Sequence, residues 1–226
     1  MNNAVKSGSE ELFRRYFKEE FLEREDVDGN RPIHIACCAG HTGIVKLLID
    51  HHCDIEACDW DGWRPIHHAC GEADIEIVKL LIDHHCDIDA CDSDGWRPIH
   101  HACGEADIEI VKLLIDHHCD IDACDRDGWR PIHHACSEAD IEIVKLLIDH
   151  HCDIDACDRV HFGRPPYDNC PLCAVIFKVI SLKKLDLPEP QLMTAQMKSF
   201  IKEMLNPNPK KRSSAAQLLN LNLFSN

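Results

Sequence analysis

Two residue types that bind zinc and carry out nucleophilic chemistry are frequent in this chain of 226 residues, which has 17 His and 15 Cys. Four copies of Asp-His-His-Cys stand at residues 50–53, 83–86, 116–119 and 149–152. The copies are 33 residues apart, which for packed helices corresponds to about 8–10 Å. That separation is too large for one tetrahedral ion, and a disulfide needs Cα atoms within about 7 Å. We therefore expect reduced thiols, no metal and no cofactor, with a metal-binding repeat protein as the least favoured alternative.

The same four letters are the signature of protein palmitoyltransferases, and that resemblance would imply an enzyme. Those enzymes resemble polytopic membrane proteins, whereas no run of this chain approaches the roughly 18 apolar residues that a membrane span needs. The four copies also recur in phase with a longer repeat. We interpret the tetrads as coincidental and expect no catalytic residues.

The longer repeat is the strongest signal in the sequence. Asp61-Gly-Trp-Arg-Pro-Ile-His-His-Ala-Cys recurs from Asp94 and from Asp127, and a more divergent copy starts at Asp28. A fixed period of 33 residues is typical of a solenoid, in which each unit buries its apolar face against its neighbours. We expect an all-α solenoid over residues 26–160. Its four repeats would span residues 28–60, 61–93, 94–126 and 127–159.

Local signals within one unit predict two helices and an extended finger. Pro65 suits the first turn of a short helix that runs to about Cys70, because proline lacks only an N–H that would be unpaired there. Asp74 can cap a second helix that is apolar over a wide face. Residues 85–96 have turn chemistry and few apolar side chains, so we expect a hairpin-like finger.

These units resemble ankyrin repeats. Residues 64–69, Arg-Pro-Ile-His-His-Ala, are similar to the family's Thr-Pro-Leu-His-x-Ala motif, and residues 77–82 and 87–90 match its second helix and its finger entry. The chain departs from the pattern with Arg64 for the motif threonine, Ala73-Asp74 for Gly-His, and His85 for a helix-ending glycine. A positive φ at a residue other than glycine costs on the order of 1 kcal/mol, so we expect strain at His85 and its equivalents His118 and His151.

Two histidines per repeat are expected inside the array. The resemblance implies that the first one bridges backbone groups of adjacent repeats, a structural role that we assign to His34, His67, His100 and His133. The second stands where repeat one has Ile35, which predicts a core-facing ring at His68, His101 and His134. Burial lowers a histidine pKa, so acid should destabilise the array. A satisfied core ladder and a pH sensor both remain open for these rings.

The tryptophans define the predicted partner-binding surface. All four fall in finger segments, and the ankyrin resemblance implies that fingers and first helices line a groove for partners. A tryptophan beside acidic side chains is typical of an interaction hot spot. The alternative is that each indole covers the neighbouring finger. The candidate partner-binding residues are Trp60, Trp63, Trp96, Trp129, Glu72, Glu105, Glu138 and Arg126.

The two ends of the chain differ from the repeats. Residues 9–22 read as an amphipathic helix, which we assign to an N-terminal cap over residues 1–25, with a partner-binding helix as the alternative. Residues 161–226 contain a stretch, 205–219, that resembles the end of the C-lobe of Ste20-like protein kinases. No glycine-rich loop, catalytic loop or Asp-Phe-Gly accompanies it, so we expect a short, non-catalytic helical segment. This basic tail could dock on the acidic repeats.

Charge narrows the class of partner. With 24 Lys and Arg against 40 Asp and Glu, the formal net charge is -16. Such a charge repels nucleic acid and favours a protein with a basic surface. We expect a cytoplasmic or nuclear monomer that acts as a scaffold or adaptor, with no membrane partner. A truncated ankyrin–kinase fusion, whose repeats recruit substrates or regulators, is the alternative.

Overall fold

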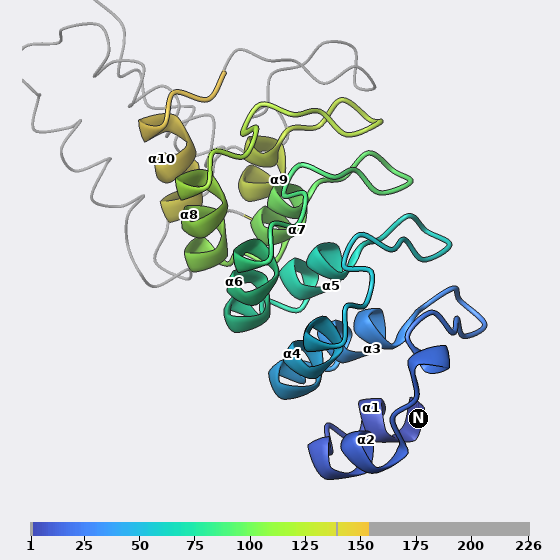
Figure 1. The fold of residues 1–226 in the computed structure, drawn as a ribbon. Helices are drawn as coiled ribbons and strands as arrows, with labels where there is room; N and C mark the ends of the chain where they lie inside the picture. The colour runs from blue at the N-terminus through green and yellow to red at the C-terminus, as the bar shows by residue number, and fades with distance from the viewer. Residues whose placement is uncertain (1, 139, 154–226) are drawn as a thin grey trace, which may run out of the picture. The chain divides into compact units, whose positions relative to one another are not determined.

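The computed structural model describes residues 2–138 and 140–153, and these residues form ten α-helices, one 3-10 helix and no strand (Figure 1). The all-α solenoid predicted from the sequence is confirmed. The kinase-like stretch, its docking on the repeats and the end of the fourth repeat lie outside the described residues. The chain has two units, residues 1–166 and 167–226, and every helix that the structure describes belongs to the first.

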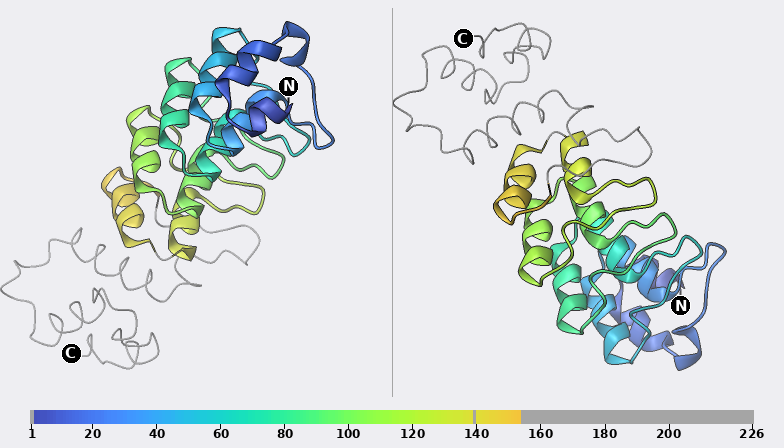
Figure 2. Two further views of the ribbon diagram at one scale, coloured as in Figure 1. Left: turned by 90° about the horizontal axis from the view of Figure 1, so that it is seen from below. Right: turned by 90° about the horizontal axis from the view of Figure 1, so that it is seen from above.

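Each repeat contributes a first and a second helix, and like helices pack in two rows (Figures 1 and 2). Finger loops extend from the same side of successive repeats. Each finger is counted here with the first helix that follows it, so the finger of residues 85–96 belongs to the repeat of α7 and α8 and not, as in the predicted bounds, to the repeat of residues 61–93. The first helices are α3 (Pro32–Cys38), α5 (Pro65–Gly71), α7 (Pro98–Gly104) and α9 (Pro131–Ser137). The second helices are α4 (Thr42–Asp50), α6 (Ile75–Asp83), α8 (Ile108–Asp116) and α10 (Ile141–Asp149).

Helix boundaries follow the local signals. Each first helix has proline in its first turn, and α5 runs one residue beyond the predicted Cys70. Asp74 caps α6 as predicted, because its carboxylate accepts a hydrogen bond from the Ile77 amide at 3.1 Å. The aspartates Asp107 and Asp140 cap α8 and α10 in the same way.

The core lies between the two rows of helices. In α6, the side chains of Ile77, Val78 and Leu81 are fully buried, while Leu80 is half-buried. Ile66 of α5 is buried opposite them. The same positions are buried in α7 to α10, so each repeat supplies one layer of a continuous apolar core.

The predicted backbone strain is present at the end of every second helix. His85, His118 and His151 have φ values of 63°, 66° and 65°, and His52 of repeat one has 59°. A second left-handed residue joins the two helices of a repeat: Gly40 in repeat one, but Ala73 and Ala106 in the next two. Histidine and alanine thus stand at positions where ankyrin repeats usually have glycine. Their Cβ atoms make the left-handed conformation unfavourable, as glycine would not.

The segment predicted as a single helix over residues 9–22 is a short helix followed by a 3-10 turn. Ser9 caps the start of helix α2 (Glu10–Tyr16). The helix ends at Phe17, whose ψ of 135° is extended. The extended backbone at Phe17 allows its ring to stack on His51 of the first repeat, with 4.0 Å between ring centroids. A 3-10 turn, η1 (Glu19–Phe21), follows. Helix α1 (Asn2–Lys6) precedes α2 in the chain and packs against α3, whereas α2 packs against α4.

Replacement of His118 by glycine should raise the free energy of unfolding by about 0.5–1 kcal/mol, because glycine adopts φ of 66° without steric cost. Urea denaturation of the full chain measures this change. His117→Gly is the matched control: its φ is −90°, so glycine should bring no gain there. Equal effects of the two substitutions would contradict the assignment of strain to His118.

Candidate functional site

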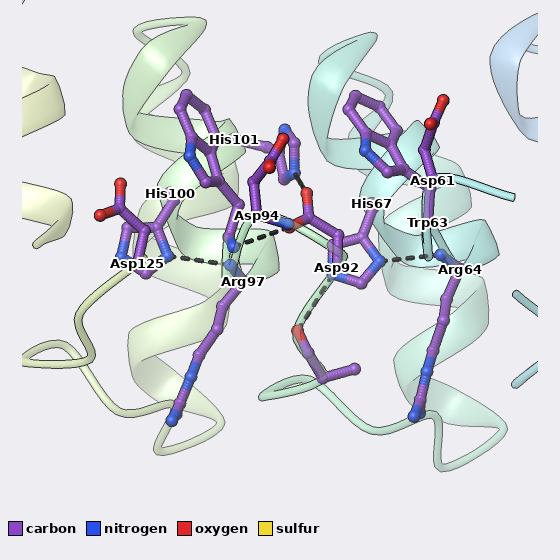
Figure 3. A network of polar contacts seen from close by, with 12 residues as sticks. Asp61, Trp63, Arg64, His67, Asp92, Asp94, Arg97, His100, His101 and Asp125 are labelled. Carbon is purple, nitrogen blue, oxygen red and sulfur yellow. Dashed lines mark hydrogen bonds and ion pairs between the residues drawn. The ribbon is translucent and has the colours of Figure 1, made fainter. Parts of the chain in front are cut away.

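The first histidine of each repeat lies between the backbones of two repeats (Figure 3). In repeat two, the Arg64 amide donates to Nδ1 of His67 at 2.9 Å, and Nε2 of His67 lies 3.0 Å from the Ala90 carbonyl oxygen of the next repeat. Because Nδ1 accepts, Nε2 must carry the proton and donate it to that carbonyl. His34 and His100 repeat both contacts, with Nε2 to carbonyl distances of 2.8 and 3.1 Å, and His133 repeats the first.

These buried rings are neutral. Burial, and after it the neighbouring histidines His101 and His134, lower the pKa of His67 and of His100 to about 4. The hydrogen bonds to Ala90 and Ala123 and the carboxylates of Asp92 and Asp125 only partly oppose this effect. Protonation would also convert Nδ1 from an acceptor into a donor that faces the arginine amide.

The second histidine of each repeat binds a buried aspartate of its own finger. Nε2 of His101 lies 3.3 Å from an Asp92 oxygen, and the other Asp92 oxygen accepts from the Asp94 and Trp96 amides at 2.8 Å each. Burial raises the pKa of Asp92, but the hydrogen bonds from His101 and the two amides outweigh it and hold the pKa below its usual value. Equivalent contacts join His68 to Asp59 at 3.0 Å and His134 to Asp125 at 3.3 Å.

Sequence reasoning missed these aspartates, although each stands four residues before a tryptophan. A carboxylate that accepts from amides two and four residues ahead is the signature of an aspartate-centred turn, and that spacing is visible in the sequence. Asp92 therefore sets the shape of the finger and holds the second histidine in place.

Three tryptophans alternate with these histidines along the repeats. The Trp63 ring lies 5.0 Å from His68 of its own repeat and 4.4 Å from His101 of the next, between ring centroids. Trp96 lies in the same way, 5.0 Å from His101 and 4.3 Å from His134. We call this row, with Trp129 at its end, the aromatic ladder; its members are His68, Trp63, His101, Trp96, His134 and Trp129.

The ladder tryptophans are half-buried, and their ring contacts support the packing alternative for them. Trp60 is different: it is 70% exposed and stands at a fingertip. Its amide donates to the Asp28 carbonyl of the preceding finger at 3.3 Å. Its indole lies so close to Gly29, at φ of 81°, that a side chain on that residue would collide with it. Arg126 is exposed at the fourth fingertip.

The three candidate glutamates are exposed at the carboxyl ends of the first helices. Glu72 follows Gly71, and a Cβ on that glycine would lie 3.6 Å from the Trp63 ring. Glu72 and Glu105 thus directly follow residues that lie against a tryptophan of the aromatic ladder. Partner binding by these residues remains a prediction.

A comparison with protein families assigns the repeats. A family model described as ankyrin repeats (3 copies) matches residues 1–92 and 70–158. The chain belongs to the ankyrin-repeat family. Ankyrin repeats are generally protein-interaction modules without catalytic activity. A search of curated proteins gave no significant match.

Arginine replaces the ankyrin motif threonine and ties adjacent repeats together. Nη1 of Arg97 lies 3.1 Å from an Asp89 oxygen and 3.2 Å from an Asp120 oxygen of the next repeat. The same Asp89 oxygen accepts from the Asp120 amide at 3.0 Å. Arg64 makes these contacts with Glu56 and Asp87, and Arg130 with Asp122 and Asp153.

Neither a metal centre nor a membrane span is found in the part of this ankyrin chain that the structure describes. Within residues 2–138 and 140–153, no three or more His, Cys, Asp or Glu side chains are grouped to hold an ion. No helix there is both long and apolar enough to cross a membrane.

The free energy of unfolding should fall as pH drops from about 6.5 to about 4. The unfolded chain takes up protons on His67 and His100 near pH 6.5, whereas the folded chain does so only near pH 4. Their stabilisation is complete above pH 6.5, and its loss is on the order of 3 kcal/mol per ring at pH 4. Urea denaturation at several pH values tests this. A stability that is constant over this range would contradict buried neutral rings.

Proposed function

We propose that this chain is a non-catalytic adaptor that binds a basic partner protein through the finger and first-helix side of its ankyrin repeats. The observation that carries the proposal is a row of exposed glutamates, repeated with the period of the array, beside the aromatic ladder. Family membership supports it, because ankyrin repeats are generally protein-interaction modules.

The positive charges of a repeat are already bound to carboxylates. Within residues 62–94 there are eight Asp and Glu against Arg64 and Lys79. Arg64 pairs with Glu56 and Asp87, and Lys79 pairs with Glu76 at 3.3 Å. Glu72 and its equivalents have no such cation among the described residues, so their charge is free to attract a basic surface.

The tryptophans have two roles in this proposal. Trp60 offers a large exposed aromatic side chain at a fingertip, of the kind that anchors partners. The half-buried Trp63, Trp96 and Trp129 form a rigid floor, and only their remaining exposed edges contact a partner. Arg126 would face an acidic group of the partner or remain in solvent.

Charge reversal tests the proposed surface. The triple variant Glu72→Lys, Glu105→Lys, Glu138→Lys should lose partners because it replaces an attractive row by a repulsive one. Its fold should survive, since lysine at the carboxyl end of a helix is favourable. Proximity-labelling or pull-down mass spectrometry of the full chain, after circular dichroism, compares the variant with the wild type.

The matched control is Asp83→Lys, Asp116→Lys, Asp149→Lys. These aspartates are exposed at the carboxyl ends of the second helices, in the other row, and the substitutions change the net charge equally. Partners lost only from the glutamate variant support the proposal. Partners retained by both variants, or lost equally from both, would contradict this surface.

An ankyrin–kinase fusion remains the second candidate, favoured only by the kinase-like stretch at residues 205–219. In that case the repeats would recruit substrates or regulators for a catalytic domain encoded elsewhere in the same gene. A longer transcript with an intact catalytic loop would support it.

A further inference from the structure

One position at the end of the first helix is open in the two middle repeats. Gly71 is the last residue of α5, and Gly104 is the last residue of α7. Outside its own helix, a Cβ on Gly71 would lie within 4 Å of the Trp63 ring alone among the described residues, at 3.6 Å. A Cβ on Gly104 would likewise lie 3.8 Å from the Trp96 ring. Each glycine therefore leaves space beside the six-membered ring of an indole.

The first repeat has a side chain at the equivalent position, and that side chain contacts a glutamate of the next repeat. Cys38 stands there, and its Sγ lies 3.8 Å from Oε1 of Glu72. Glu72 thus extends back toward the end of α3, the helix that packs against its own α5. Because α7 packs against α5 in turn, the equivalent Glu105 is within reach of the open position at Gly71.

Two positions of the array therefore combine an open glycine, an indole and a carboxylate. The first consists of Gly71, Trp63 and Glu105. The second is one repeat further along and consists of Gly104, Trp96 and Glu138. Both glutamates are exposed. We call these two positions the glycine sites.

We propose that each glycine site binds one lysine or arginine side chain of the partner protein. The aliphatic stem of such a side chain packs at the open glycine, where a carbon atom lies at van der Waals distance from the indole. Its charged end pairs with the glutamate of the next repeat. This inference rests on the proposed function, because it specifies how the acidic side of the array binds a basic partner.

The distance between the two glycine sites determines the spacing of the basic residues. The ring centroids of Trp63 and Trp96 lie 4.4 and 5.0 Å from that of His101, so the two indoles are less than about 10 Å apart. A chain in the polyproline II conformation rises about 3.1 Å per residue and completes a turn in three residues. Residues three apart are therefore about 9 Å apart and on the same face. The partner that fits is an extended segment with Lys or Arg at every third position.

The first and fourth repeats differ from the glycine sites and provide internal comparisons. Repeat one has Asn30 at the tryptophan position and Cys38 at the glycine position. Repeat four keeps Trp129 but has Ser137, which is exposed at the end of α9. A side chain is thus compatible with the fold at this position, so a glycine site can be filled without loss of the helix.

Two peptides of equal composition and charge test the spacing. The periodic peptide has three copies of Arg-Pro-Pro, and the block peptide has three consecutive arginines followed by six prolines. Isothermal titration calorimetry with the full chain, at one pH and ionic strength, measures the Kd of each. We expect the periodic peptide to bind about tenfold more tightly, because two of its arginines occupy both glycine sites at once. Equal affinities, or no binding of either peptide, would overturn the proposal.

The double variant Gly71→Met, Gly104→Met fills both glycine sites and leaves every charge in place. Methionine is a good helix former, and neither glycine has a positive φ, so circular dichroism should be unchanged. The tighter binding of the periodic peptide should disappear. Ser137→Met is the matched control, because it adds the same side chain outside the two sites and should keep the preference. A preference retained by the double variant contradicts the proposal.

Failure of this inference is distinguishable from failure of the proposed function. If the wild type binds both peptides equally and the triple variant Glu72→Lys, Glu105→Lys, Glu138→Lys binds neither, the acidic surface binds basic partners without the glycine sites, and only the inference fails. If that triple variant keeps its cellular partners, the proposed function fails whatever the peptides show.

Discussion

The hydrogen-bonding capacity of a neutral imidazole is the constraint on which the rest of this array depends. His67 accepts from the amide that begins its own first helix and donates to a carbonyl of the next repeat. One side chain therefore provides the hydrogen-bond partner of two backbone groups, one in each repeat. The two hydrogen bonds fix the spacing between the repeats. Because the ring is buried and must remain neutral to make both, acid destabilises the fold.

Other inter-repeat contacts depend on that spacing. The second histidine comes one residue after the first, so it is carried to a position between two indoles, and Asp92 holds it there. On the other side of the same helix start, Arg97 reaches carboxylates of two repeats. Successive fingers approach closely enough for the Ser93 amide to donate to the Asp61 carbonyl at 2.9 Å. The left-handed residues Ala73 and His85 flank the two ends of α6, between first helices that these contacts hold in place.

Period, helix starts and helix ends could be predicted from the sequence, because each rests on residues close together in the chain. Pro65 and Asp74 act within one turn of their own helices, and His85 is forced into a left-handed conformation by the helix before it. The turn around Asp92 is visible in the local spacing to Trp96, but the contact of its carboxylate with His101 was missed because that partner lies nine residues away. Helix α2 was predicted too long because Phe17 gains a ring contact with His51, a residue of the first repeat. Arg64 was noted only as a departure from the motif, since its two carboxylates, Glu56 and Asp87, come from different repeats.

The state of the bridging imidazoles is the most direct test of this account. Long-range ¹H–¹⁵N correlation spectra of the uniformly labelled chain, recorded as pH is lowered, report the tautomer and the pKa of each ring. The account predicts that His67 and His100 carry their proton on Nε2 and titrate near pH 4. A proton on Nδ1, or titration of these two rings near pH 6.5, would contradict the claim that a neutral histidine links one repeat to the next.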